Sequence, residues 1–411
     1  RALEKMAARV LRRSILNAEG YGNTAPSFSL KLFCSFSKAR FFASSSKLLN
    51  APIPKIRVKK DRSFEHVAEL EKDIAPLLRI KDTFLQFKKE TIPLQYLTLR
   101  RRFLGVRTTE EKFEELMKDY PTIFQIYMHP DEHRLWLKLT PEAKELVEQE
   151  RLIHERQEPL IVGKLRRLLM LTHGQSMRAN RVLMLAPFLG FPDDLLTRVV
   201  PKYPEYFNLA QNGKPYQILE LMVWDEGLAM TEFEKRAKLS AQKSGMGNVE
   251  SLGYPPSYHL KYTAGVVPRR KAIAYLQEWQ KLPFVSPYEN ADNIEIGTPL
   301  GDRRMVAFLH ELLSLTIQKK ITIEVLNHFH SEFKLPGNIY KAVNRYPGIF
   351  YISVKGAVHT LYLREAYDSK QLIGAAHPLL ILKKRFAKMV HNGPRLRAMM
   401  KNAIRNAKFK L

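Results

Sequence analysis

Three stretches of the chain share one pattern of hydrophobic and polar positions. In each stretch, apolar side chains recur at intervals of three and four residues and lead into the sequence Tyr-Pro-x-x-Phe, at residues 120–124, 203–207 and 346–350. The spacing predicts a helix with one apolar face. The proline predicts that this helix ends just before it, because proline disfavours the α conformation in the preceding residue.

After each phenylalanine, the pattern changes to two short runs of alternating polarity that are separated by a turn. Alternation is typical of strands that are buried on one face, and the second runs occupy residues 135–139, 218–221 and 361–363. Asn212 and Gly213 in the second turn are a strong hairpin signal, since both central residues of a type I′ turn need positive φ. We therefore predict three related units, each with two helices and a β-hairpin.

The three units predict a mostly helical α+β fold. Two compatible interpretations of a unit remain open. It is a packing unit whose motif tyrosine and phenylalanine lie in the core, or a winged-helix-like shape of the kind that binds nucleic acid. Further helices are expected to begin near Ser63, at Pro141 after Thr140 as N-cap, and near Arg303.

The composition along the chain predicts where the domains begin and end. Residues 55–240 are expected to hold the first and second units, packed together, and residues 269–380 the third. Residues 241–268 are polar and rich in Gly, Pro and Ser, which is typical of a linker. Residues 381–411 contain no Asp or Glu and predict a basic tail, which is either solvated or bound to nucleic acid.

Residues 1–46 have the composition of a mitochondrial targeting presequence, being rich in Arg and Ser and poor in acidic residues. We expect translation to start at Met6 and cleavage to follow Phe42, with the chloroplast as the alternative destination. The single cysteine, Cys34, lies in this segment. The processed chain would then have no thiol for a disulfide, a zinc site or a nucleophile.

The net charge points to the kind of partner. The chain has 67 Lys and Arg against 41 Asp and Glu, a formal net charge of +26. Such an excess predicts a polyanionic partner, with nucleic acid as the first candidate. A structural protein of the mitochondrial ribosome and a winged-helix DNA-binding regulator remain alternatives. No apolar run is long enough to span a membrane, so no membrane partner is expected.

Enzyme motifs are incomplete in this sequence. His310 and Glu311 begin like a zinc-protease helix, but Ser314 stands where the second histidine ligand is needed. His328 and His330 are two residues apart, which places them on different helix faces. We expect no catalytic residues, no small-molecule substrate, no metal and no cofactor.

Several longer phrases are distinctive, among them Trp-Gln-Lys-Leu-Pro-Phe-Val-Ser-Pro-Tyr at residues 279–288 and Leu-Glu-Leu-Met-Val-Trp-Asp at residues 219–225. Others lie at residues 164–170, 189–192, 310–316, 348–353 and 363–367. In these phrases the chain resembles the plant organelle RNA recognition (PORR) family, over roughly residues 55–390. The resemblance implies an organelle RNA-binding protein that promotes splicing of group II introns, within a ribonucleoprotein that can contain other splicing factors.

Group II introns have an active site of RNA and magnesium, so a protein helper is expected to neutralise phosphates rather than to supply an acid or a base. Exposed aromatic side chains could add base stacking. The candidate RNA-binding residues are Lys59, Lys60, Arg62, Arg100, Arg101, Arg102, Lys164, Arg166, Arg167, Arg178, Arg181, Lys383, Lys384 and Arg385. For each cluster, the ordinary alternative is a solvated helix face.

Overall fold

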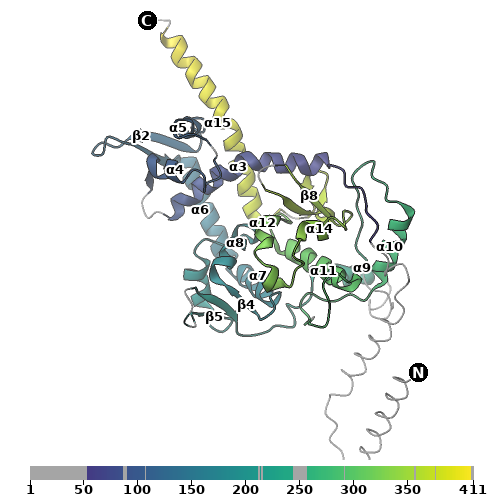
Figure 1. Cartoon of the computed structure of the whole chain (residues 1–411). Coiled ribbons are helices and arrows are strands. Elements are labelled where there is room, and N and C mark those ends of the chain that lie inside the picture. The colour runs from purple at the N-terminus through teal and green to yellow at the C-terminus, as the bar shows by residue number, and fades with distance from the viewer. Residues whose placement is uncertain are drawn as a thin grey trace, which may run out of the picture. The chain divides into compact units, whose positions relative to one another are not determined.

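The computed structural model describes residues 53–408 except 87–89, 107, 212, 214–215, 244–256, 291, 356–357 and 375. In these residues, helices combine with small antiparallel sheets, so the α+β prediction is confirmed (Figure 1). The predicted presequence, Cys34, Asn212 and the centre of the predicted linker lie outside the described residues.

Three of the sheets have the same construction. In each, a long helix precedes a three-residue strand, short helices follow, and a hairpin completes the sheet. The leading strand always pairs with the second hairpin strand, which gives the orders β1-β3-β2, β4-β6-β5 and β7-β9-β8. We call the three segments the first, second and third unit.

The bounds of the elements are as follows. The first unit contains α3 (Arg62–Gln86), β1 (Thr91–Pro93), α4 (Leu94–Arg100), α5 (Glu110–Lys118), β2 (Phe124–Met128) and β3 (Leu135–Leu139). The second contains α7 (Glu158–Met170), β4 (Ser176–Arg178), α8 (Ala179–Leu189), η2 (Leu195–Val199), η3 (Val200–Lys202), β5 (Phe207–Ala210) and β6 (Ile218–Leu221). The third contains α11 (Pro299–Leu315), β7 (Lys320–Thr322), α12 (Ile323–Asn327), α13 (His330–Phe333), α14 (Ile339–Val343), β8 (Phe350–Ser353) and β9 (Thr360–Leu363). Outside the units lie α6 (Pro141–Arg156), α9 (Glu232–Lys243), α10 (Arg270–Lys281), η5 (Arg364–Ala366), β10 (Tyr367–Asp368), β11 (Gln371–Leu372) and α15 (Pro378–Lys408).

The three predicted hairpins are present, and helices begin near the predicted positions. Thr140 caps α6, because its hydroxyl accepts a hydrogen bond from the amide of Ala143 at 3.3 Å. The leading strands were not predicted, since three residues are too few to show alternation. In the second unit, the helix before the motif is a π-helix and a 3₁₀ turn, because Pro201 has no N–H and restricts Val200. A winged-helix-like nature of the units stays a prediction.

The motif phenylalanines start the first hairpin strands and are buried, with exposed fractions of 4% or less. Each lies opposite the last leucine of the second strand: Phe124 and Leu139, Phe207 and Leu221, Phe350 and Leu363. Tyr346 is also buried, and its hydroxyl donates a hydrogen bond to the buried Asp302 at 2.9 Å. Tyr120 is only partly buried but packs against the core of the first unit. The core prediction is wrong for Tyr203, which is partly exposed and whose hydroxyl donates to Glu158 near the surface.

Helix α3 joins the first unit to the third (Figure 1). Its N-terminal Phe64 packs between Tyr351 and Tyr362 of the third sheet. Its later residues, among them Ile80 and Phe84, belong to the core of the first unit. Both ends of α3 are therefore held by hydrophobic contacts.

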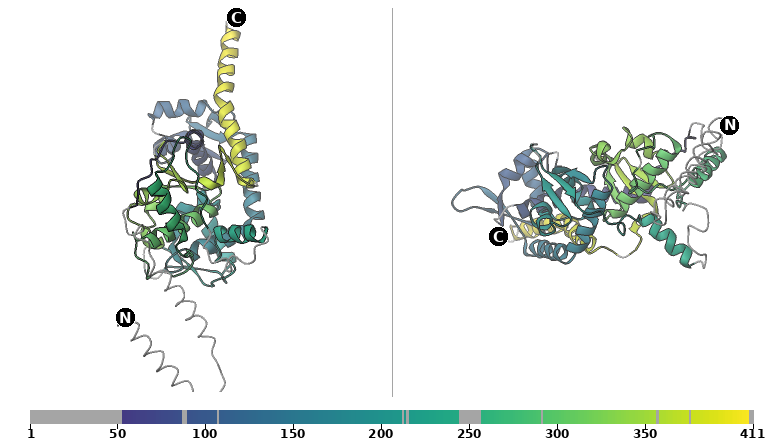
Figure 2. Two further views of the ribbon diagram at one scale, coloured as in Figure 1. Left: turned by 90° about the vertical axis from the view of Figure 1, so that its right-hand side faces the viewer. Right: turned by 90° about the horizontal axis from the view of Figure 1, so that it is seen from below.

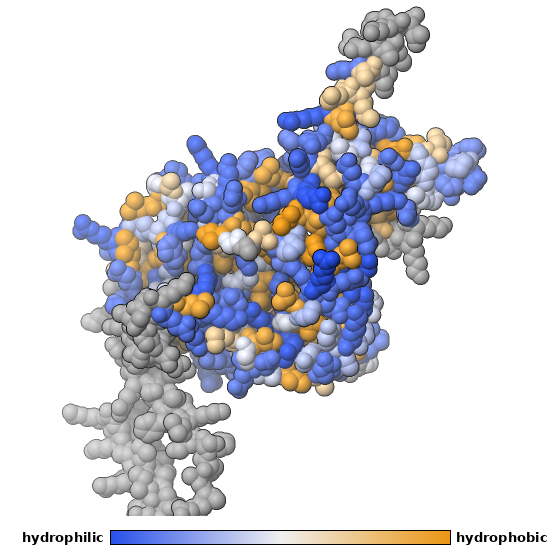
Figure 3. Space-filling model, turned by 180° about the vertical axis from the view of Figure 1, so that it is seen from behind, coloured by the Kyte–Doolittle hydropathy of each residue, from blue (hydrophilic) through white to orange (hydrophobic). Residues whose placement is uncertain are grey.

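The basic segment 381–411, expected as a tail, is helical to Lys408 as part of α15. Phe386 and Val390 are buried in the core of the first unit, and α15 packs along α6. The later turns of α15 extend beyond α5 (Figures 1 and 2), and Leu396, Met399 and Met400 are exposed there. Apolar residues are visible on this end of the helix in Figure 3, where hydrophilic residues cover most of the remaining surface.

Helix α11 carries a buried polar network that connects the second and third units. Glu311 is fully buried and accepts hydrogen bonds from Arg167 of α7 at 2.5 Å and from the Tyr288 hydroxyl at 2.8 Å. The neighbouring His310 contacts Glu365 at 2.6 Å. Because Glu311, Arg167 and Glu365 each have a partner of opposite charge or a hydrogen-bond partner, the network offsets much of the cost of burying these charges.

Candidate nucleic-acid interface

The candidate cations fall into two groups that differ in their exposure to solvent. Eight are exposed: Lys59, Lys60, Arg62, Arg100, Arg102, Arg178, Lys384 and Arg385. The other six are partly buried and bonded to the protein itself: Arg101, Lys164, Arg166, Arg167, Arg181 and Lys383. The two groups alternate along the sequence, so a basic run does not mark a continuous surface.

The α7 cations illustrate the second group. Arg167 is held by Glu311, Glu232 and Tyr288. Arg166 pairs with Asp225 at 3.1 Å and lies over the ring of Tyr206 at 4.2 Å. The Lys164 ammonium donates to the carbonyl of Leu189 at 3.3 Å, and burial lowers the pKa of Lys164 to about 8. These cations have structural partners, which leaves them less free to bind phosphate.

The N-terminal arm, residues 55–62, presents the densest group of exposed cations in the described chain. Lys55, Arg57, Lys59, Lys60 and Arg62 are all exposed, and none of them forms an ion pair with a described carboxylate. The arm therefore presents five side chains that can accept phosphate partners without breaking a contact in the protein.

The arm is fixed in place by its one acidic residue. The Asp61 carboxylate pairs with Arg364 at 3.1 Å and accepts from the Thr263 hydroxyl at 3.3 Å. The Asp61 amide donates to the Tyr351 hydroxyl at 3.1 Å. Since Arg364 is buried and these contacts link Asp61 to residues far along the chain, they hold the backbone at Asp61 in place without a ligand. Preorganisation of this kind lowers the entropy cost of binding.

A second set of exposed cations follows the segment that contacts the arm, in which the Thr263 hydroxyl donates to the carbonyl of Lys59 at 3.4 Å. The ammonium of Lys59 lies next to Gly265, where an added Cβ would be 3.5 Å from it. Four residues later, the exposed Arg269, Arg270 and Lys271 begin α10. These three cations were not among the predicted RNA-binding residues, although they form the run Arg-Arg-Lys in the sequence. We call Lys59, Lys60, Arg62, Arg269, Arg270 and Lys271 the arm surface.

A third exposed patch surrounds the turn after α4. Phe103 is 87% exposed and Leu99 is 67% exposed, with Arg100 and Arg102 beside them. The guanidinium of Arg100 lies 4.1 Å from the centre of the Tyr96 ring. Arg101, by contrast, holds the turn by donating to the carbonyls of Thr98 and Thr108, both at 2.8 Å. The arginines were predicted from their sequence, but the exposure of Phe103 is visible only in the structure.

The residues that begin like a zinc-protease motif are part of the buried network. His310 and Glu311 are both fully buried, with Glu365 and Arg167 as partners. Within the described part of the chain, no group of three His, Cys, Asp or Glu residues is placed to hold a metal ion. None of the described helices is both long and apolar enough to span a bilayer.

A comparison with known protein families identifies the family of this chain. The plant organelle RNA recognition domain matches residues 59–395, which is most of the chain and includes all three units. The chain belongs to the plant organelle RNA recognition family. In this family member, the match begins within the arm and ends within α15.

Three relatives show the range of names within the family. Protein ROOT PRIMORDIUM DEFECTIVE 1 of Arabidopsis thaliana is 27% identical over 82% of this chain and 83% of its own length. Protein WHAT'S THIS FACTOR 1 homolog, chloroplastic, of Oryza sativa subsp. japonica is 26% identical over 89% of this chain and 75% of its own length. Protein WHAT'S THIS FACTOR 9, mitochondrial, of Arabidopsis thaliana is 27% identical over 81% of this chain and 84% of its own length. No solved structure gives a significant match.

Proposed function

We propose that this protein binds organelle intron RNA and promotes splicing of group II introns without performing the chemistry itself. The observation that carries the proposal is the arm surface: its exposed cations have no described carboxylate partner, and Lys59, Lys60 and Arg62 lie on a backbone fixed by Asp61. Membership in a family named for RNA recognition supports it.

The arm surface would act by neutralising phosphates at fixed positions. Each phosphate neutralised on single-stranded RNA contributes about 0.7 to the slope of log affinity against log salt. Six contacts would therefore give a slope of about −4. Cations on an ordered backbone select RNA segments whose phosphates have matching spacing, so that one fold of the intron is favoured over others.

We further propose that the three units are winged-helix-like, on the basis of their shared strand order. In the first and second units, the helix before the motif nevertheless disfavours binding to duplex DNA. The helix before the first motif, α5, carries Glu110, Glu111, Glu114 and Glu115, which would repel DNA phosphates. In the second unit, Arg198 is already paired with Asp194 and Glu158. The arm surface offers a better contact for RNA than these helices offer for a DNA groove.

The proposed location is the mitochondrion, with the chloroplast as the alternative. Support comes from the composition of residues 1–46. Relatives with mitochondrial and with chloroplastic names both occur, so the family permits either organelle. A fluorescent fusion of residues 6–60 tests the assignment: co-localisation with a mitochondrial dye is expected, and accumulation in plastids would overturn it.

The function is tested by binding and by capture. The purified full chain should bind group II intron transcripts more tightly than duplex DNA of equal length at the same salt concentration. RNA co-immunoprecipitation from isolated mitochondria should enrich intron-containing transcripts. Equal affinity for duplex DNA would favour a DNA-binding regulator. Stoichiometric sedimentation with ribosomal subunits would favour a structural protein of the ribosome, the other open possibility. Other splicing factors are expected in the captured ribonucleoprotein.

A further inference from the structure

A cleft lies where the second unit meets the third. It has a volume of about 380 Å³, within the range of small-molecule sites. The turn after α7, residues 170–175, forms one wall, and residues 287–290 with Glu332, Phe333 and Lys334 form the other. Trp224 and Arg304 complete the lining. A backbone hydrogen bond from His173 to the carbonyl of Glu332, 2.8 Å long, holds the two walls together.

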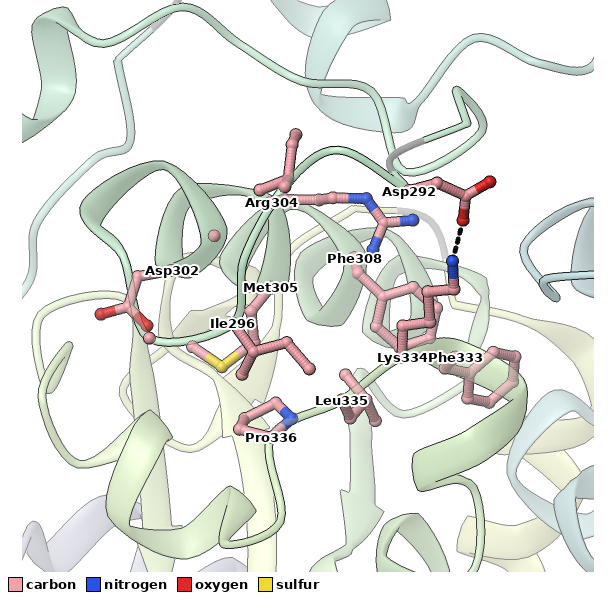
Figure 4. A pocket seen from close by; sticks show the side chains of 13 residues that line it. Asp292, Ile296, Asp302, Arg304, Met305, Phe308, Phe333, Lys334, Leu335 and Pro336 are labelled. Atoms are coloured by element: carbon pink, nitrogen blue, oxygen red, sulfur yellow. Dashed lines mark hydrogen bonds and ion pairs between the residues drawn. The ribbon is translucent and has the colours of Figure 1, made fainter.

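Arg304 lines this cleft and also the smaller pocket beside it (Figure 4). Its Nε atom is shielded from solvent and has no hydrogen-bond partner among the described atoms. In Figure 4, the guanidinium lies beside Phe308 and near Asp292, but Asp292 is paired with Lys334 instead. A guanidinium Nε–H that is desolvated and has no acceptor carries an uncompensated cost. A ligand with hydrogen-bond acceptors would remove that cost.

The other residues that line the cleft indicate which kind of ligand it can bind. Glu289 and Glu332 are carboxylates in its lining, and they disfavour a phosphate group. Trp224 offers an aromatic face: it is partly exposed, whereas Trp136 and Trp279 are at most 8% exposed. No ring contact in the described chain covers Trp224. An uncharged, planar ligand with hydrogen-bond acceptors fits this combination.

We propose that the cleft receives one nucleobase extruded from the bound RNA, with Trp224 stacked on its face and Arg304 donating to its edge. The proposal rests on the proposed RNA-binding function and adds a base-specific contact to it. Guanine is the expected base, because its O6 and N7 atoms accept the two parallel hydrogen bonds of a guanidinium. The arm surface would then supply affinity, and the cleft would supply sequence preference.

Intrinsic tryptophan fluorescence of the full chain tests the cleft directly, since Trp224 is the most exposed of the three tryptophans. GMP, AMP, CMP, UMP and inorganic phosphate are titrated at constant ionic strength. Saturable quenching is expected from the nucleotides, strongest with GMP, and none from phosphate. Trp224→Phe should abolish the response. Equal effects of phosphate and GMP, or unchanged quenching in Trp224→Phe, would overturn the proposal.

RNA binding distinguishes failure of this inference from failure of the proposed function. Trp224→Ala and Arg304→Gln should each weaken binding of intron RNA by about 5- to 150-fold, the value of one stacked base or of one bidentate contact to a base edge. The salt slope should not change, because no phosphate contact is lost. Arg304→Lys keeps the charge but lacks the planar fork, so it should lose the preference for guanine. Circular dichroism confirms that each variant is folded.

These measurements distinguish a wrong assignment of the cleft from a wrong assignment of RNA binding. Wild-type affinity in folded Trp224→Ala and Arg304→Gln would refute the cleft and leave RNA binding intact. Absence of RNA binding by the wild-type chain would instead refute the proposed function. A matched control, Lys341→Gln, changes an exposed cation on α14 away from the cleft lining and should leave the fluorescence response intact.

Discussion

Removing the cations of the arm tests whether affinity is concentrated on this surface. In the variant Lys59→Gln, Lys60→Gln and Arg62→Gln, three exposed side chains without carboxylate partners lose their charge. Asp61 and its contacts to Arg364 and Tyr351 remain, so the backbone of the arm should keep its position. The change therefore acts on binding rather than on folding.

The size of the effect follows from the number of phosphates released. With about 0.7 per phosphate, the loss of three contacts should reduce the slope of log affinity against log salt by about 2. Between about 0.05 M and about 0.2 M salt, wild-type affinity should then fall about 20-fold more than that of the variant. Fluorescence anisotropy with a labelled intron transcript at four or more salt concentrations measures both slopes.

A control variant with equal loss of charge decides the interpretation. Lys112, Arg134 and Arg156 are exposed and lie on α5, the first hairpin and α6, away from the arm. Their replacement by glutamine should leave the slope nearly unchanged. If both triple variants reduce the slope equally, affinity comes from the general charge of the protein, and the role of the arm surface is refuted.

Three further predictions concern stability. Glu311→Ala leaves Arg167 without its buried partner and should lower the free energy of unfolding by about 3–5 kcal/mol in urea titrations; a loss below about 1 kcal/mol would contradict the network. Burial alone would raise the pKa of Glu365, but contacts with His310 and Arg236 lower it to about 2. A lowered pKa adds stability above the unfolded value near 4.5 that is lost as pH falls toward 2. This contribution is about 3 kcal/mol, and Glu365→Gln should flatten the pH dependence of thermal unfolding in that window; parallel curves for both proteins would contradict it. Gly190 ends α8 with φ of +74°, and an added Cβ would lie 2.0 Å from Ile317. Gly190→Ala should therefore lower stability by more than about 1 kcal/mol, whereas Gly163→Ala, where an added Cβ meets nothing, serves as the tolerated control.

The sequence alone was sufficient for the local elements. The apolar spacing before each Tyr-Pro-x-x-Phe motif and the alternation after it predicted the hairpins, because both patterns depend on residues a few positions apart. The burial of Phe124, Phe207 and Phe350 follows from the same patterns. The resemblance to the plant organelle RNA recognition family depended on longer phrases of the same sequence. The match of the family's domain to residues 59–395 confirms it.

Only the tertiary structure decided which cations face solvent. Arg166 and Arg167 have the same sequence surroundings as a solvated basic helix, yet their partners lie 59 and 144 residues away. Asp61, which fixes the arm, meets an arginine 303 residues further along the chain. Contacts at such separations leave no local periodicity in the sequence. The arm surface and the cleft at Arg304 therefore emerge only when distant segments pack together.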